Sequence, residues 1–418
     1  MGSEMCIRDS LSIQEMLAAF HIATQLPASE QVSKFNELFD NSRFSAVFQF
    51  YAGITKLQTP GISAVITRVA TKCGVEDPKD KDKTLLLSLL HCLYEAQDPF
   101  LCESVSYHLQ GGLNLNRTTL TPSDCLYIGY VLSCVCSTTA GKFKVNLSGC
   151  NIGAQGYKYL VSGLHRCLDT HSTVTTTLCI VLFDSDINDQ GVSEFSKLLQ
   201  TDCIKTLNLA YNFELSDEGV CIIAEKLKHN TSLTTLRLVG CCLESKGVEC
   251  LASALTTNSS LVELYCGNTR GDDVIEQLAH AIRVNNSLKV LYLGNCGMRD
   301  EGLESLARSL QHNKSLKQLN ICNTFWSYYR EGLGYWSIAN PNTITKKGVS
   351  VLTKCLKKNN SLSKLILPAE FKSSTTIVQE AVNEARKKNG QPFIEVIGES
   401  FSLQLVKLGS VCTCATYG

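Results

Sequence analysis

Two hydrophobic spacings alternate along this chain from residue 204 to residue 315. A short LxxLxL segment is followed each time by a longer segment, G(V/L)xxLAxxLxxN, whose apolar residues lie three and four apart. The first spacing indicates a short β-strand and the second an amphipathic α-helix. When Ile204, Leu233, Leu261 and Leu288 are aligned, the two segments recur with a period of 27 to 29 residues. A fixed period in this range predicts a solenoid.

The unit that begins at Leu233 indicates which solenoid this is. We expect Leu236 and Leu238 to point inward from the strand. Cys241 lies where leucine-rich repeats place Asn or Cys, whose side chain can hydrogen-bond to neighbouring turns. One such unit cannot bury its own apolar face, whereas a stack of units can. The sequence therefore predicts an α/β leucine-rich-repeat solenoid, a horseshoe with parallel strands inside and helices outside, preceded by a small α-helical domain.

An asparagine recurs at the end of each predicted helix. Asparagine tolerates the left-handed conformation that ends many helices, so we expect these residues to adopt it. Each of them also begins an N-x-S sequence, the acceptor pattern for glycosylation. We interpret them as helix ends, because the repeat alone accounts for their spacing. They are Asn230, Asn258, Asn285, Asn313 and Asn359.

The repeat pattern extends over residues 110–398, with one interruption and a C-terminal cap. The interruption is an inserted loop at residues 325–343, which carries both tryptophans of the chain, Trp326 and Trp336. Insertions in a solenoid map to loops on one face, often the binding face. The end of the repeat region predicts one helix and one edge strand, and residues 399–418 form a tail without a pattern.

The chain before the repeats predicts helices without any repeat. Residues 11–109 contain several amphipathic segments and form the α-helical domain of this interpretation. Residues 1–10, MGSEMCIRDS, match nothing that follows, and we interpret them as a non-native or artefactual leader.

Composition narrows the class of protein. The 39 basic and 39 acidic residues cancel, so we expect no nucleic-acid partner. No run of 18 apolar residues is present, and we expect no membrane span. The 21 cysteines show no C-x-x-C pair and no framework of paired spacings. This usage favours reduced thiols and a cytoplasmic protein.

Few residues in the sequence could form a catalytic or metal site, and we expect no enzyme, no cofactor and no metal. Three acidic pairs fall at the start of predicted repeat helices, where carboxylates favour the helix dipole and the free N–H groups. The pairs are Asp217 with Glu218, Asp272 with Asp273, and Asp300 with Glu301. His165, Cys167 and His171 could be drawn as metal ligands, but no fourth ligand is evident.

The repeats do predict a binding surface, because strand residues between the inward leucines face the concave side. One column contains Asn208, Arg237, Tyr265, Tyr292 and Asn320, and a second contains Tyr211, Asn268, Asn295 and Asn323. Tyr and Arg are residue types that anchor interfaces. We therefore expect a protein-binding strip on the concave face, together with the loop that carries Trp326 and Trp336. The alternatives are an ordinary solvated face and a loop that buries its aromatic residues against the repeats.

Three N-terminal segments, LSIQEMLAAFHI, NSRFSAVFQFYAGITKL and LHCLYEAQDPFLCESV, resemble the last helical, winged-helix/HD2-like part of the NACHT module in NOD-like receptors. NLSGCNIGAQG, from Asn146, and its successors resemble the ribonuclease-inhibitor-type leucine-rich repeats that follow in that family. The resemblance covers roughly residues 11 to 400. Two departures stand out: the apolar residues expected before Leu11 are CIRDS here, and no G-x-x-x-x-G-K-[ST] sequence is present to hold a nucleotide phosphate.

The resemblance implies a protein of innate immune sensing or its regulation, with a protein partner or microbial ligand on the concave face. It also implies self-association through an upstream NACHT domain, which this sequence lacks. A second hypothesis is a freestanding inhibitor or scaffold that resembles ribonuclease inhibitor. A third is a fragment of a nucleotide-hydrolysing receptor whose P-loop lies upstream.

Overall fold

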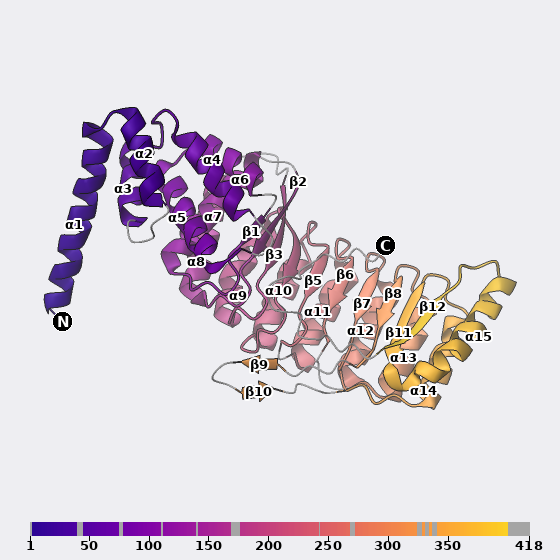
Figure 1. The fold of residues 1–418 in the computed structure, drawn as a ribbon. Helices are drawn as coiled ribbons and strands as arrows, with labels where there is room; N and C mark the ends of the chain where they lie inside the picture. The colour runs from indigo at the N-terminus through magenta and orange to yellow at the C-terminus, as the bar shows by residue number, and fades with distance from the viewer. Residues whose placement is uncertain are drawn as a thin grey trace. The chain divides into compact units, whose positions relative to one another are not determined.

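The computed structural model divides the chain into two compact units, residues 1–179 and residues 180–418 (Figure 1). The residues that it describes are 2–39, 45–74, 78–109, 112–138, 141–168, 176–241, 243–267, 272–323, 328–330, 334–336 and 341–399.

The first unit begins with helices and continues into the first repeats. Its helices are α1 (Gly2–Gln25), α2 (Ala28–Phe39), α3 (Ser45–Thr55), α4 (Ile62–Cys73), α5 (Asp80–Ala96) and α6 (Pro99–His108). The repeats contribute β1 (Gly112–Asn114), α7 (Pro122–Thr138), β2 (Gly141–Asn146) and α8 (Gly153–Leu168). Strands β1 and β2 pair in parallel, as the repeat pattern predicts. The described residues of the 1–10 segment belong to α1, so the helix continues through the expected leader.

A buried hydrogen-bond network connects three helices of this unit. His91 of α5 lies 2.6 Å from the Asp124 carboxylate of α7, and its other ring nitrogen faces Gln49 of α3. Thr121 donates to the same carboxylate from its backbone and its hydroxyl. Burial by itself would raise the pKa of Asp124, but the hydrogen bonds from His91 and Thr121 outweigh it, and the pKa lies below its ordinary value.

The second unit contains the regular repeats. Strand β3 (Thr176–Val181) spans the division between the two units. The elements that follow it are α9 (Asp189–Phe195), the 3₁₀ helix η2 (Ser196–Gln200), β4 (Ile204–Asn208), α10 (Asp217–Leu227), β5 (Thr235–Arg237), α11 (Ser245–Thr257), β6 (Glu263–Tyr265), α12 (Asp272–Val284), β7 (Val290–Tyr292), α13 (Asp300–Leu310) and β8 (Gln318–Asn320). The remainder is β9 (Tyr328–Arg330), β10 (Gly334–Trp336), α14 (Lys346–Leu356), β11 (Lys364–Pro368), the 3₁₀ helix η3 (Ala369–Ser374), α15 (Thr375–Lys388) and β12 (Glu395–Glu399).

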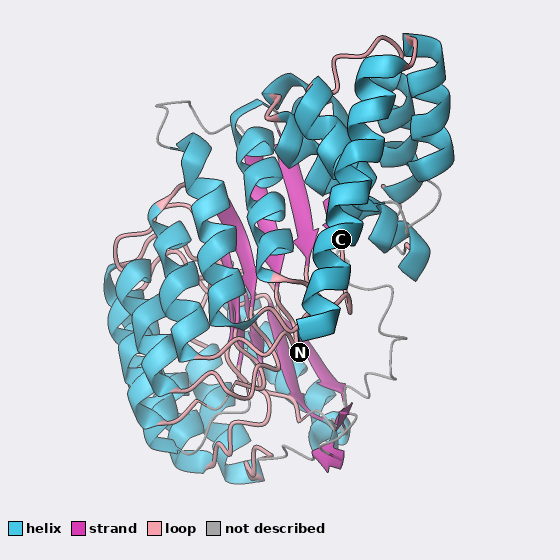
Figure 2. Ribbon diagram, turned by 90° about the vertical axis from the view of Figure 1, so that its left-hand side faces the viewer, coloured by secondary structure: helices cyan, strands magenta, loops and turns pink. Residues whose placement is uncertain are grey.

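The register of the parallel sheet follows the leucine period. Leu207 pairs with Leu236 and Leu236 with Leu264, and each of them is fully buried. Helices α10 to α13 pack against their successors, and Figure 2 shows the strands in one layer with helices along its side. The predicted leucine-rich-repeat fold is confirmed, and α15 and β12 are the helix and edge strand expected at the end of the repeat region.

The recurring asparagines form a ladder between repeats, and the expectation that they are left-handed is wrong. None of the five has a positive φ; Asn258, for example, has φ −70°. Its amide donates to Leu227 O at 2.8 Å and Asn230 O at 3.0 Å in the preceding repeat, and its Oδ1 accepts the Ser260 N–H. These side chains are at most 7% exposed. Burial of the amide agrees with the interpretation that the N-x-S sequences belong to the repeat.

A second ladder explains the acidic residues at the helix starts. Asp217 and Glu218 begin α10, as expected, and Asp217 accepts the Glu244 N–H of the next repeat at 2.8 Å. A Cβ on Gly247 would lie 2.4 Å from that carboxylate oxygen. A larger residue at this helical position would displace the carboxylate that caps the next repeat, so glycine suits the position.

The strand ends carry a third ladder, which shows where the inserted segment joins the repeats. The Cys241 thiol faces Leu209 O of the preceding turn at 3.2 Å, as expected. Near the C-terminal end of the insertion, Asn342 takes the equivalent role: its Oδ1 accepts the N–H groups of Cys296 and Met298. Asn323 and Asn342 bond to each other at 2.7 and 3.0 Å, so both ends of the insertion meet at one place.

Candidate interaction surface

Three side chains of the predicted strip lie in contact on consecutive strands. Arg237, Tyr265 and Tyr292 end strands β5, β6 and β7 in register and are all partly exposed. The Arg237 guanidinium lies 4.2 Å from the centre of the Tyr265 ring, within the range of a cation–π interaction. The Tyr265 and Tyr292 ring centres are 6.1 Å apart, and the Tyr265 hydroxyl donates to Glu263 at 3.2 Å. The strip is therefore an ordered surface.

Two glycines that follow strands β6 and β7 lie against the ring of Tyr292, the last member of the strip. A Cβ on Gly267 would lie 2.6 Å from Cε1 of Tyr292, and a Cβ on Gly294 would lie 2.4 Å from its hydroxyl. Any larger residue at either position would push the ring away. Because the ring is already fixed by the backbone below it, binding a partner would order few additional rotamers.

The asparagines of the first predicted column are used inside the fold. Asn208 and Asn320 are each 6% exposed, and their side-chain oxygens accept the N–H groups of Ala210 and Cys322. The strip is therefore limited to its three central members. Asn208 and Asn320 shape the turns that follow the strands.

The second predicted column is buried, which corrects the expectation that it faces the concave surface. Tyr211 is 4% exposed and packs 5.0 Å from the Phe183 ring, and burial raises the pKa of its hydroxyl above its ordinary value. Asn295 is 1% exposed, and Asn323 closes the base of the insertion. Residues that follow the strand turn into the core, because the chain bends there towards the helix. Asn268 lies outside the described residues.

The two tryptophans are only partly placed. Trp326 lies outside the described residues. Trp336 belongs to β10, which pairs antiparallel with β9 and places Trp336 opposite Tyr328 in the backbone register. The expected metal-ligand candidates His165, Cys167 and His171 lie where the structure describes no side chains. Elsewhere in the described part of the chain, no three His, Cys, Asp or Glu side chains gather as a metal site.

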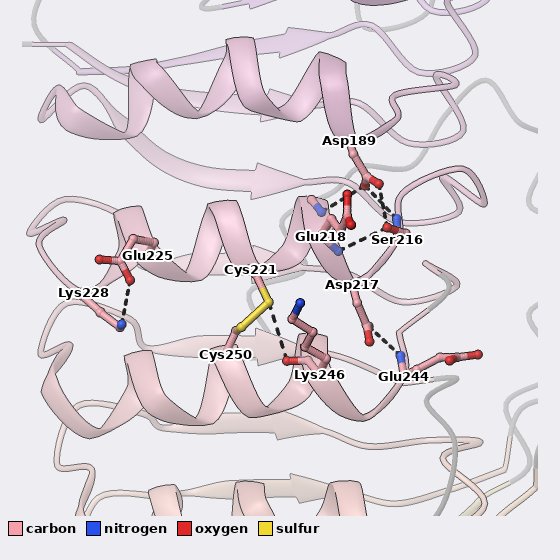
Figure 3. The surroundings of a disulfide bond; sticks show 11 residues. Asp189, Ser216, Asp217, Glu218, Cys221, Glu225, Lys228, Glu244, Lys246 and Cys250 are labelled. Carbon is pink, nitrogen blue, oxygen red and sulfur yellow. Dashed lines mark hydrogen bonds and ion pairs between the residues drawn. A yellow bond between two sulfur atoms is a disulfide. The ribbon is translucent and has the colours of Figure 1, made fainter.

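A disulfide joins two neighbouring repeats and corrects the expectation that all thiols are reduced. Cys221 of α10 and Cys250 of α11 are bonded, with their Cα atoms 5.2 Å apart (Figure 3). They are 29 residues apart, the length of one repeat, so the stack places them side by side. The signal in the sequence is the repeat period itself, because the two cysteines lie one repeat apart and not at a short spacing. Fourteen other described cysteines are not in disulfide bonds.

We predict that this disulfide contributes measurably to stability. Replacing both Cys221 and Cys250 with Ser should lower the free energy of unfolding by about 2 to 3 kcal/mol, because the crosslink limits the unfolded chain. Urea unfolding with and without dithiothreitol measures the effect. Reductant should lower the stability of the unaltered protein to that of the double variant and leave the variant unchanged. An equal effect of reductant on both proteins would contradict the prediction.

The described helices include none that is both long and apolar enough to cross a bilayer. The fold defines the class: the described repeats form a leucine-rich-repeat solenoid with parallel strands. The family model for the leucine-rich repeat matches residues 229–252 and 284–307.

The chain is similar to two groups of proteins. It is 30% identical to pig (Sus scrofa) ribonuclease inhibitor over 50% of the chain and 45% of that protein. It is 29% identical to mouse (Mus musculus) ribonuclease inhibitor over 65% of the chain and 58% of that protein. It is 27% identical to human (Homo sapiens) NACHT, LRR and PYD domains-containing protein 3 over 67% of the chain and 25% of that protein. The chain thus spans about half of the inhibitors and a quarter of the human protein.

These similarities agree with the architecture. The repeats are of the ribonuclease-inhibitor type and of the kind that NOD-like receptors carry, as the sequence predicts.

Proposed function

We propose that this chain is the ligand-recognising part of a NOD-like-receptor-type protein and binds a protein partner or microbial ligand on its concave face. The observation that carries this proposal is the strip of Arg237, Tyr265 and Tyr292, which is ordered, partly exposed and in contact across three repeats. Fixed aromatic and arginine side chains of this kind supply most of the energy of interfaces. The proposed setting is the cytoplasm, in innate immune sensing or its regulation.

A crosslinking experiment tests the concave face as the binding surface. We expect a photo-reactive benzoylphenylalanine at Tyr292 to crosslink a partner in cells, and the same residue at Glu276, exposed on α12, not to do so. With the captured partner purified, Tyr265→Ala should weaken binding about tenfold or more, because the change removes the support of both Arg237 and Tyr292. Crosslinks from Glu276 alone, or unchanged affinity, would refute the proposal.

We further propose that the insertion at residues 325–343 contributes to binding. The Asn323–Asn342 bonds close its base, and Asn342 restores the ladder at its C-terminal end. Deleting residues 326–340 and joining the ends with a short Gly-Ser linker should therefore weaken binding but change the unfolding free energy by less than about 1 kcal/mol. Thermal unfolding and partner affinity are the two measurements. A large loss of stability would mean that the insertion is structural instead.

The alternative is a freestanding inhibitor or scaffold, which the similarity to ribonuclease inhibitor favours. The two differ in assembly. A receptor part is proposed to self-associate through an upstream NACHT domain, whereas an inhibitor acts as a single chain. Native mass spectrometry of the protein purified from its source distinguishes the two.

A further inference from the structure

Charge is divided between the strands and the helices of the regular repeats. In the strand segments 204–208, 234–237, 262–265, 289–292 and 317–320, the cationic residues are Lys205, Arg237, Lys289 and Lys317, and the anionic residue is Glu263. The helices α10 to α13 carry ten acidic and four basic residues. The whole chain, by contrast, has a formal net charge of zero. These segments, the strand side of the repeats, therefore carry four cations and one anion, and Lys289 and Lys317 come directly before β7 and β8.

The cations of the strand side are free to meet a ligand. In the described part of the chain, no ion pair engages Lys205, Arg237, Lys289 or Lys317, and each is at least partly exposed. The carboxylate of Glu263 already accepts a hydrogen bond from Tyr265. The Arg237 guanidinium rests on an aromatic face, which leaves its N–H groups without a carboxylate partner.

We infer that the concave face of the regular repeats takes an acidic protein segment, with a carboxylate on Arg237 and further carboxylates towards Lys289 and Lys317. This inference rests on the proposed function and names the chemistry of the partner. Unpaired cations beside fixed tyrosine rings complement an acidic chain that carries apolar or aromatic side chains. A nucleic acid fits less well, because the acidic helices of the same repeats would repel a long polyanion.

The footprint sets the length of a suitable probe. Strands β4 to β8 are separated by four spacings of about 4.8 Å, or roughly 19 Å in all. An extended segment of about six residues crosses that distance. A fluorescein-labelled peptide of roughly twice that length, built from Asp and Glu with one Tyr, is therefore the probe. Its twin, with Asn and Gln in place of Asp and Glu, is the matched control.

Fluorescence anisotropy with the full chain is the test. The acidic peptide should bind at least about tenfold more tightly than its amide twin, and binding should weaken as salt rises from about 50 to 500 mM. Arg237→Gln should cost about tenfold, and Arg237→Lys, which keeps the charge, should cost less. Lys289→Gln with Lys317→Gln should weaken binding by a similar factor. Arg308→Gln, an exposed arginine of α13, should change nothing.

Three results would overturn the inference: equal binding of the two peptides, an equal cost for Arg308→Gln, or complete displacement of the acidic peptide by poly(U) RNA at lower concentration. The proposed function can fail or survive separately. If a partner crosslinked from Tyr292 loses affinity with Tyr265→Ala but not with Arg237→Gln, the concave face binds that partner and the acidic-segment inference is wrong. If neither substitution lowers the affinity, both the proposed function and the acidic-segment inference are wrong.

Discussion

Replacing Asn285 with Ala should lower the free energy of unfolding by about 3 to 5 kcal/mol. Its amide is 3% exposed and donates to Leu255 O at 2.8 Å and to Asn258 O at 3.1 Å. Its Oδ1 accepts the N–H groups of Ser287 and Leu288. Alanine leaves two buried carbonyls and two buried N–H groups without this partner, and each such group costs about 1 to 3 kcal/mol when unpaired.

Asn286 is the matched control for this prediction. It is the next residue, it is exposed, and its amide reaches only Val284 O within its own repeat. Urea unfolding should show a change of less than about 0.5 kcal/mol for Asn286→Ala. Hydrogen exchange should localise the loss in Asn285→Ala to the boundary between the two repeats, because repeat stability is a sum of neighbour terms. Equal losses in the two variants would show that the ladder contributes nothing specific.

Replacing Arg386 with Ala should destabilise the C-terminal cap by about 3 to 5 kcal/mol. Arg386 is fully buried in α15 and has a pKa lowered by that burial. Its guanidinium donates to Leu362 O at 2.7 Å, to Pro392 O at 3.1 Å and to Oδ1 of Asn359, the last rung of the asparagine ladder. Alanine would take the guanidinium donor away from Leu362 O and Pro392 O, remove one of the hydrogen bonds that Asn359 Oδ1 accepts, and open a cavity.

The comparison for Arg386 lies in the same helix. Lys388 is a basic residue of α15 whose side chain is 74% exposed and paired with Glu384, so Lys388→Ala should cost less than about 1 kcal/mol. Arg386→Lys should fall between the two, because an ammonium group cannot reach all three acceptors in the geometry of a guanidinium. Hydrogen exchange of α15 and β12 provides the measurement. Retention of full protection in Arg386→Ala would show that the cap holds by apolar packing alone.

The sequence by itself determined the fold, because the leucine period encodes it directly. Leu233, Leu261 and Leu288 recur once per repeat and are buried in the stack. Periodicity is a local property of the chain, so it can be measured without any contact. The acidic residues at the helix starts and the Cys241 hydrogen bond were predicted on the same basis, and the structure confirms both.

The tertiary structure decided which side chains remain exposed and can contact a partner. Tyr211 and Tyr292 were both expected on the concave face, in neighbouring columns, yet Tyr211 is buried and Tyr292 is partly exposed above Gly267 and Gly294. The difference arises because the chain turns after each strand, and a period alone does not fix the direction of that turn. The same cause explains three other features that the sequence did not show. They are the disulfide from Cys221 to the next repeat, the charge of the strand side and the burial of Arg386. Each depends on which residues of neighbouring repeats face one another, and only the stacking of the repeats determines that.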